Sequence, residues 1–230
     1  MLICAIDTSG RDGSLALADG DATSFSLLHS APIAGGTDSA KLIPTLAEAL
    51  AAAGKQKSEI GLLAVASGPG SFTGLRVGLS TVKALAEVLH VPVVAISVLE
   101  AIAYAAGKQG LLLAALDAQR NELFVGEFES SPGTITTVRE ALVTAADFVT
   151  WLSGKSLVTH TPDAAVEARV REAGASGERV ARPTAELYAR LGLREYLAGE
   201  VSSIDELDAN YIRRSDAEIF SAPKLGIKTS

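Results

Sequence analysis

An apolar strand that ends in aspartate, turns and returns occurs twice in this sequence, and this feature limits the possible folds most. The first copy covers residues 2–7 and returns at Ser14, and the second covers residues 111–117 and returns at Glu122. A repeated strand–turn–strand unit is typical of an internally duplicated chain. Two short matches can also arise by chance, so duplication and coincidence both stay open on the pattern alone.

The segments around these hairpins predict an α/β fold of mixed sheets covered by helices. In the first half we expect strands at 2–7, 14–18, 24–28, 62–67 and 92–96, and helices at 39–53, 73–89 and 97–106. In the second half we expect strands at 111–117, 122–128 and 135–143, followed by helices at 145–152, 163–172 and 183–198 with polar loops between them.

The glycines at 107 and 110 suggest a boundary between two lobes. We expect an N-terminal lobe at 1–106, a C-terminal lobe at 107–218 whose last long helix is free to pack back on the first lobe, and a tail at 219–230.

Composition excludes several functional classes. The chain has 48% hydrophobic residues and a formal net charge of −7, so it can fill a core but is poorly suited to bind nucleic acid unaided. No apolar stretch is long enough to span a bilayer, and the N-terminus leads directly into the first strand without a signal peptide, so we expect a cytoplasmic protein. The single cysteine, Cys4, lies in an apolar run and is expected to be a buried thiol.

The glycine-rich segment from Ser67 to Gly78 follows an apolar strand and opens a helix. Free N–H groups at such a turn can bind an anion, but the spacing fits neither the Walker motif nor the Rossmann fingerprint. Gly74, Gly78 and Thr81 instead leave a strip of small residues on one helix face, and glycines inside a helix require a packing reason. That packing is either internal, against the sheet, or external, against another subunit.

The helix expected at 39–53 also has an apolar face and few charges. It is therefore either fully buried or covered by a partner. Two such helices side by side would form an interface.

Five ordered segments resemble the TsaB (YeaZ) family, and together they span most of the chain. They are Ile6-Asp7-Thr8-Ser9, Gly68-Pro69-Gly70-Ser71-Phe72-Thr73-Gly74-Leu75-Arg76-Val77-Gly78, Ser97-Val98-Leu99-Glu100, Asp117-Ala118-Gln119-Arg120-Asn121-Glu122 and Tyr211-Ile212-Arg213-Arg214. The resemblance implies two tandem RNase H-like lobes in the actin-like and Hsp70-like ATPase (ASKHA) architecture. It further implies a non-catalytic partner in the threonylcarbamoyladenosine modification of tRNA.

The resemblance also implies the partners and the surface that binds them. The chain would form a homodimer in isolation and would alternatively pair with the paralogue TsaD, with TsaE joining as an ATPase and tRNA bound only within the complex. The implied interface consists of Leu42, Ile43, Leu46, Phe72, Thr73, Leu75, Arg76, Leu79 and Lys83. Asp38 stands where the family usually has histidine, and it can still cap the first helix.

The residues themselves do not predict an active site, a metal or a cofactor. His29, His90 and His160 lack the spacing of a metal pair. Asp7, Thr8, Ser9 and Asp117 stand where related ATPases grip phosphate, but the second hairpin has no glycine, so this set is interpreted as a vestigial nucleotide site. The alternative function is a nucleotide-dependent phosphotransferase or a peptidase of the same broad fold.

Overall fold

The computed structural model of this chain describes residues 1–33, 39–152, 157–205 and 207–208. Its first part contains a five-stranded sheet in the order β3-β2-β1-β4-β5, in which the first three strands are antiparallel and the last two join β1 in parallel. The elements are β1 (Leu2–Asp7), β2 (Gly13–Gly20), β3 (Phe25–Ile33), α1 (Ser39–Ala52), the 3-10 turn η1 (Lys57–Glu59), β4 (Ile60–Gly68), α2 (Phe72–Leu89), β5 (Val93–Ser97) and α3 (Val98–Ala105).

The second part repeats this arrangement. Its sheet has the order β8-β7-β6-β9-β10, and a helix follows the third, fourth and fifth strand just as in the first part. The internal duplication is therefore confirmed. The elements are β6 (Gly110–Asp117), β7 (Glu122–Ser131), β8 (Thr134–Thr144), α4 (Ala145–Leu152), β9 (Val158–Thr161), α5 (Ala164–Glu172), β10 (Ser176–Arg179) and α6 (Ala185–Leu197).

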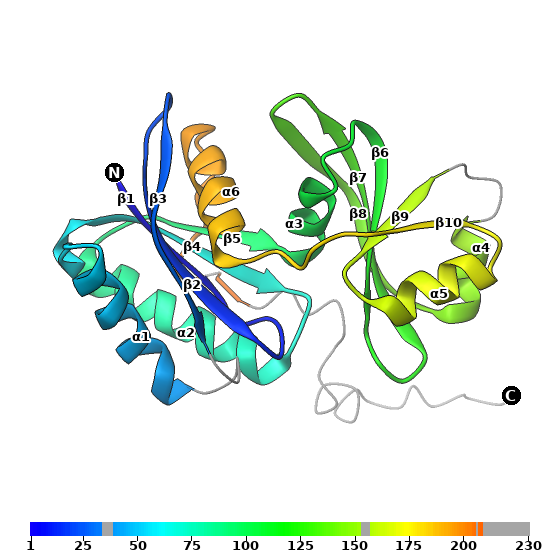
Figure 1. Cartoon of the computed structure of the whole chain (residues 1–230), viewed down its shortest axis with the longest axis horizontal. Helices are drawn as coiled ribbons and strands as arrows, with labels where there is room; N and C mark the ends of the chain where they lie inside the picture. The colour runs from blue at the N-terminus through cyan, green and yellow to red at the C-terminus, as the bar shows by residue number, and fades with distance from the viewer. Residues whose placement is uncertain (34–38, 153–156, 206, 209–230) are drawn as a thin grey trace, which may run out of the picture.

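The helices lie in three layers around the two sheets (Figure 1). Helices α1 and α2 cover the outer face of the first sheet, α4 and α5 cover the outer face of the second, and α3 and α6 lie between the sheets. Each layer contains one cluster of buried apolar residues. The fold is thus α/β with two mixed sheets covered by helices, as predicted.

Residues alternate between the layers along each buried strand. In β1, Ile3 faces the middle layer and Cys4 faces α1 and α2. The middle face of the first sheet is rich in small residues, namely Ala5, Ala16, Ala18, Ala64 and Ala66. Gly192 of α6 lies directly over Ala64, because a Cβ added at Gly192 would be 2.6 Å from the Ala64 Cβ. Small side chains on both surfaces therefore let α6 approach the sheet closely.

The last helix of each repeat packs on the sheet of the other repeat. Helix α6 contacts β1, β2 and β4, whereas α3 contacts β6 and β7. The Arg194 guanidinium of α6 donates to the Glu100 carboxylate of α3 at 2.9 Å. Because the repeats share this helical layer, a lobe boundary between residues 106 and 107 stays a prediction.

Two short strands contradict the predicted polar loops. Strand β9 buries Thr159, His160 and Thr161, so it lacks the apolar alternation of a half-buried strand, and β10 has only four residues. These segments become strands because β9 pairs with β6 and β10 pairs with β9. The prediction of polar loops was therefore wrong here, since pairing rather than local pattern decides the structure. Asp38, Tyr211–Arg214 and the predicted tail lie outside the described residues.

Among the described residues, no helix combines the length and the apolar character needed to cross a membrane.

Candidate functional site

The nine residues expected at an interface fall into two groups, and the first group is buried. Leu42 and Leu46 of α1, with Leu75 and Leu79 of α2, lie between their helices and the outer face of the first sheet. A partner cannot contact these side chains while the fold is intact. The four leucines are therefore core residues, and we remove them from the expected contact surface.

The second group lies on the solvent side of the same helices. Ile43 is 51% exposed and Phe72 is 41% exposed, and Val88, which the sequence did not single out, is 71% exposed. Thr73 and Arg76 are also exposed, and Lys83 is half-buried. Because α1 and α2 cover the same face of the sheet, their outer sides face the same way (Figure 1). The name α1–α2 face refers below to Ile43, Phe72, Thr73, Arg76, Lys83 and Val88.

Phe72 and Arg76 form a pair at the start of α2. The Arg76 Cζ lies 3.9 Å from the centroid of the Phe72 ring, which is a cation–π contact one helical turn apart. The contact restricts the ring, so the exposed apolar group has less side-chain entropy to lose when another surface covers it.

The inner side of α2 rests on the turn that follows β1. A Cβ added at Gly74 would lie 2.0 Å from the Thr8 carbonyl oxygen, and one added at Gly78 would lie 2.3 Å from Thr8 Oγ1. A Cβ at Gly70 would lie 2.3 Å from the Ser9 carbonyl oxygen. The glycines therefore pack internally, which decides between the two interpretations of the small-residue strip.

Hydrogen bonds hold this contact in register. Thr8 Oγ1 donates to the Gly74 carbonyl oxygen at 2.7 Å, and the Ser71 amide donates to the Ser9 carbonyl oxygen at 2.7 Å. Ser71 is the N-cap of α2, and its Oγ accepts from the Gly74 amide at 3.2 Å. The first turns of α2 are thus fixed to residues 8 and 9.

Asp7, Thr8 and Ser9 lie together and are all buried. The Asp7 carboxylate accepts from the Ser9 amide at 2.8 Å and from Ser9 Oγ at 2.6 Å. Burial raises the pKa of Asp7, while the two hydrogen bonds from Ser9 and the positive charge of Arg182 oppose that rise. The polar groups expected to grip a phosphate here are engaged within the chain.

Asp117, the fourth residue of the expected nucleotide site, lies in the second repeat and also interacts within the chain. It is exposed, accepts from the Gln119 amide at 3.2 Å and lies 4.0 Å from Arg169 of α5. The hairpin tip that follows has positive φ at Gln119, Arg120 and Asn121, a conformation that non-glycine residues seldom adopt. Sequence reasoning had noted the missing glycine there and did not foresee that three other residues would take the left-handed conformation.

Two residues of the second repeat were missed. Arg182 lies next to the turn after β1. Tyr188 of α6 is fully buried, and burial followed by the negative charge of Asp7 raises its pKa well above the ordinary value. Arg182 stands in a loop without periodicity, so no local signal could have found it.

The cysteine and the three histidines lie in separate elements of the fold. Burial raises the pKa of Cys4 to about 12, which confirms the prediction of a buried thiol. His29 lies on β3, His90 ends α2 and His160 is buried in β9. In the part of the chain that the structure describes, no group of three or more His, Cys, Asp or Glu residues could hold a metal ion.

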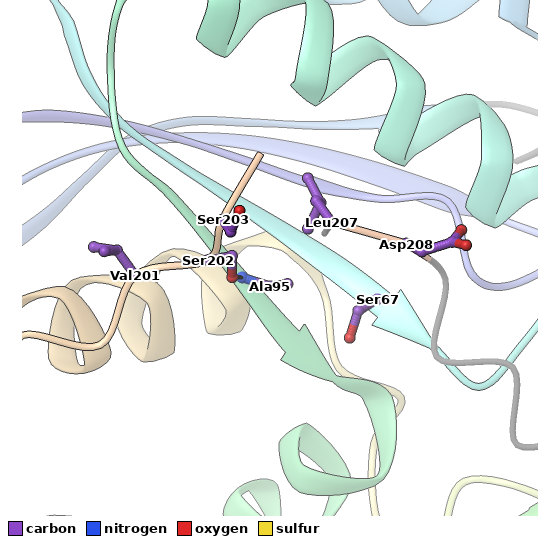
Figure 2. Close-up of a pocket in the computed structure, with 7 residues that line it drawn as sticks. All are labelled: Ser67, Ala95, Val201, Ser202, Ser203, Leu207 and Asp208. Atoms are coloured by element: carbon purple, nitrogen blue, oxygen red, sulfur yellow. Dashed lines mark hydrogen bonds between the residues drawn. The ribbon is translucent and has the colours of Figure 1, made fainter. Parts of the chain in front are cut away.

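A hollow of about 360 Å³ lies where the segment after α6 meets β4 and β5 (Figure 2). Ser202 covers the edge of β5, since its amide donates to the Val93 carbonyl oxygen at 2.8 Å and its Oγ accepts from the Ala95 amide at 3.0 Å. The hollow offers hydroxyl groups and one carboxylate. Its lining residues are Ser67, Ala95, Val201, Ser202, Ser203, Leu207 and Asp208.

Comparison with known sequences identifies the family. A family model described as TsaD: tRNA N6-adenosine threonylcarbamoyltransferase matches residues 33–185. A Bacillus subtilis protein named tRNA threonylcarbamoyladenosine biosynthesis protein TsaB is 30% identical over 67% of this chain and 67% of its own length. The chain belongs to the TsaB family. The TsaB protein of Haemophilus influenzae is 28% identical over 93% of this chain and 94% of its own length, so the similarity runs through both repeats.

Solved structures agree with this assignment at the level of the fold. A Pseudomonas aeruginosa structure, described as an uncharacterized protein with similarity to peptidase YEAZ, has a TM-score of 0.76 and 24% identity over 92% of this chain and 99% of that chain. The ROK hexokinase of Thermus thermophilus has a TM-score of 0.52 and 12% identity over 87% of this chain and 100% of that chain. The TsaB-family chain therefore shares the overall fold of these structures, with two mixed sheets covered by helices.

Proposed function

We propose that this TsaB-family chain is a non-catalytic subunit in the synthesis of N6-threonylcarbamoyladenosine in tRNA, and that it binds and activates a TsaD-type threonylcarbamoyltransferase. The names of its relatives and the match to the TsaD family model support the pathway. The observation that carries the partner role is the exposure of Ile43, Phe72 and Val88 on α1 and α2.

The chemistry of the α1–α2 face suits a protein partner. The large apolar side chains on it would gain free energy by leaving water, and the cations Arg76 and Lys83 would orient a partner's carboxylates. A face of this composition on a helix pair matches a facing helix pair by ridges and grooves. A TsaD-type protein with a related fold would supply such helices.

In this proposal the same face serves two alternatives. An isolated chain would form a homodimer through α1 and α2, and the TsaD-type partner would displace the second copy. A TsaE-type ATPase and tRNA would then join the heterodimer. Since the chain has a net charge of −7, the basic groups that bind tRNA phosphates would come chiefly from the partners.

The site geometry supports a role without catalysis by this chain. The Asp7 carboxylate, the Thr8 hydroxyl and the Ser9 hydroxyl are each hydrogen-bonded within the chain. The Cys4 thiol is buried, and burial raises its pKa to about 12. These groups are therefore held as structure, and activity would reside in the TsaD-type subunit.

The test is light scattering of the purified chain, alone and with the TsaD-type protein of the same organism, for the native protein and for Ile43→Asp and Phe72→Asp. We expect a one-to-one complex, and we expect each variant to lower the affinity at least tenfold, because a carboxylate would be buried among apolar side chains. Val138→Asp is the matched control, since Val138 is an exposed apolar residue of β8 in the second repeat.

Each sample is then assayed for threonylcarbamoylation of tRNA with a TsaE-type ATPase, ATP and threonylcarbamoyl-AMP as the donor of the transferred group. The proposal expects the chain to be inert alone and to activate the TsaD-type protein in proportion to complex formed. ATP turnover or proteolysis by the purified chain would instead support the alternative, an enzyme of the same broad fold.

A further inference from the structure

A side chain from the second repeat lies on the turn after β1. A Cβ added at Gly10 would be 2.8 Å from Nη2 of Arg182 and 2.9 Å from its Nε and Cζ, so the guanidinium lies flat against the backbone of Gly10. Arg182 Nη2 also donates to Ser9 Oγ at 3.4 Å. Only glycine at position 10 leaves room for this contact.

Charge reinforces the contact. Asp7 is buried at the base of the same turn, and its carboxylate accepts both hydrogen bonds from Ser9. A buried carboxylate is costly unless a positive charge and hydrogen bonds compensate it. Burial raises the pKa of Asp7, and after the two hydrogen bonds from Ser9 the positive charge of Arg182 opposes that rise, so Arg182 partly compensates the buried carboxylate from the second repeat.

The connector that carries Arg182 is itself held in place. Val180 donates its amide to the Thr161 carbonyl oxygen at 3.1 Å, and the Ala185 amide at the start of α6 donates to Ser14 Oγ at 2.8 Å. One end of the connector is thus tied to β9 of the second sheet and the other to β2 of the first sheet. Tyr188 lies one turn into α6 and is fully buried in the apolar cluster between the two sheets.

The same turn touches α2 on its other side. Thr8 donates to the Gly74 carbonyl oxygen and Ser9 accepts from the Ser71 amide, both at 2.7 Å. Residues 8 to 10 are therefore clamped between Arg182 and the first turns of α2. Phe72, Thr73 and Arg76 of the α1–α2 face belong to those first turns.

We propose that Arg182 is a latch by which the second repeat fixes the turn after β1 and, through Thr8 and Ser9, sets the position of the N-terminal turns of α2. The coupling of this latch to partner affinity rests on the proposed function. The latch itself, a contact within the isolated chain, does not.

The first experiment is hydrogen–deuterium exchange of the isolated full-length chain, read at the Ser9 and Ser71 amides. Arg182→Gln removes the charge and the guanidinium but keeps a polar side chain, and we expect these two amides to exchange about tenfold faster. Arg190→Gln is the matched control, because Arg190 lies on α6, pairs with Glu186 at 3.1 Å and stacks on Phe25 rather than on the turn. Unchanged exchange at both amides in Arg182→Gln would overturn the latch.

The second experiment measures the affinity of the same variants for the TsaD-type protein. We expect Arg182→Gln to weaken binding about three- to tenfold, Arg182→Lys to recover part of the loss, and Arg190→Gln to bind like the native chain. Faster exchange with native affinity would retain the latch and refute its coupling to the α1–α2 face. If the native chain binds no TsaD-type protein, the proposed function fails, while the exchange result still decides the latch.

The three variants Arg182→Gln, Arg182→Lys and Arg190→Gln are first compared with the native chain by circular dichroism and thermal unfolding. Arg182→Lys also covers the case in which Arg182→Gln does not fold, because it keeps the charge and loses only the planar contact on Gly10. The Ser9 and Ser71 amides of Arg182→Lys should then exchange faster than those of the native chain and of the Arg190→Gln control. They should exchange more slowly than fully exposed amides. Native-like exchange would contradict the planar contact.

Discussion

Thr8 donates its Oγ1 proton to the carbonyl oxygen of Gly74 at 2.7 Å, and an alanine Cβ at Gly74 would lie only 2.0 Å from the Thr8 carbonyl oxygen. The helix that presents the α1–α2 face is thereby seated directly on the turn after β1. The glycine-rich segment and the turn that follows Asp7 are far apart in the sequence, but they form one contact. Their residue types are explained by packing in the folded chain.

Gly74→Ala should therefore destabilise the fold. The new methyl group would collide with backbone rather than with a movable side chain, so we expect a loss of about 2–4 kcal/mol in the free energy of unfolding. Urea denaturation followed by circular dichroism measures it.

Gly61→Ala is the control for adding a methyl group at a glycine. A Cβ at Gly61 would meet the Met1 Cβ at 3.4 Å, an ordinary contact, and we expect a change below about 1 kcal/mol. Equal losses in the two variants would mean that the close approach at Gly74 is not the cause.

A charge at Leu75 and a charge at Phe72 should have different effects, although the two residues are three positions apart on α2. Leu75→Asp places a carboxylate in the core under the first sheet, and we expect a loss of more than about 4 kcal/mol or no folded protein. Phe72→Asp changes the first residue of the helix, where an acidic side chain interacts well with the helix dipole, and stability should change by less than about 1 kcal/mol.

Thermal unfolding of the two variants decides between core and surface roles. If Leu75→Asp folded normally and Phe72→Asp did not, the assignment of the two faces of α2 would be reversed.

The Glu100 carboxyl should make stability depend on pH. Burial is the main cause that raises its pKa from 4.5 to about 7, and Arg194 opposes the rise. The native chain then holds this proton where the unfolded chain has lost it, so the free energy of unfolding should fall as pH rises from about 4.5 to 7 and level off above. The full effect is on the order of 3 kcal/mol at most.

Glu100→Gln cannot titrate, so its denaturation curves between these pH values should lack this part of the slope. The comparison with the native chain cancels other buried groups, such as Asp7. Glu186→Gln, which removes the more exposed ion pair with Arg190, controls for loss of a surface carboxylate. An identical slope in Glu100→Gln and the native chain would exclude Glu100 as the source.

The segment after α6 should contribute to the stability of the first repeat. Leu207 is buried in the cluster beneath α1 and α2, so Leu207→Ala should cost about 2–3 kcal/mol. Leu197→Ala makes the same chemical change at a residue that is 49% exposed and should cost less than about 0.5 kcal/mol. Chemical denaturation of both variants tests this, and a loss in Leu207→Ala no larger than in Leu197→Ala would refute the role of the segment.

Local patterns predicted most elements of this fold. The strand at 2–7 agrees with β1 at both ends, and the helix at 73–89 begins one residue after α2. By contrast, β9 and β10 were missed, since their residues become strands only by pairing with β6 and with each other.

The sequence by itself determined the order of the strands and helices other than β9 and β10, and the apolar character of α1 and α2. Alternation and helical period report which side of an element avoids water, and they do so within a few residues. Only the tertiary structure decided what lies against each side: Leu75 meets the sheet, Gly74 meets Thr8, and Arg182 meets Ser9 and Gly10. These contacts join residues up to 173 positions apart, and no local period contains information about a partner at that distance.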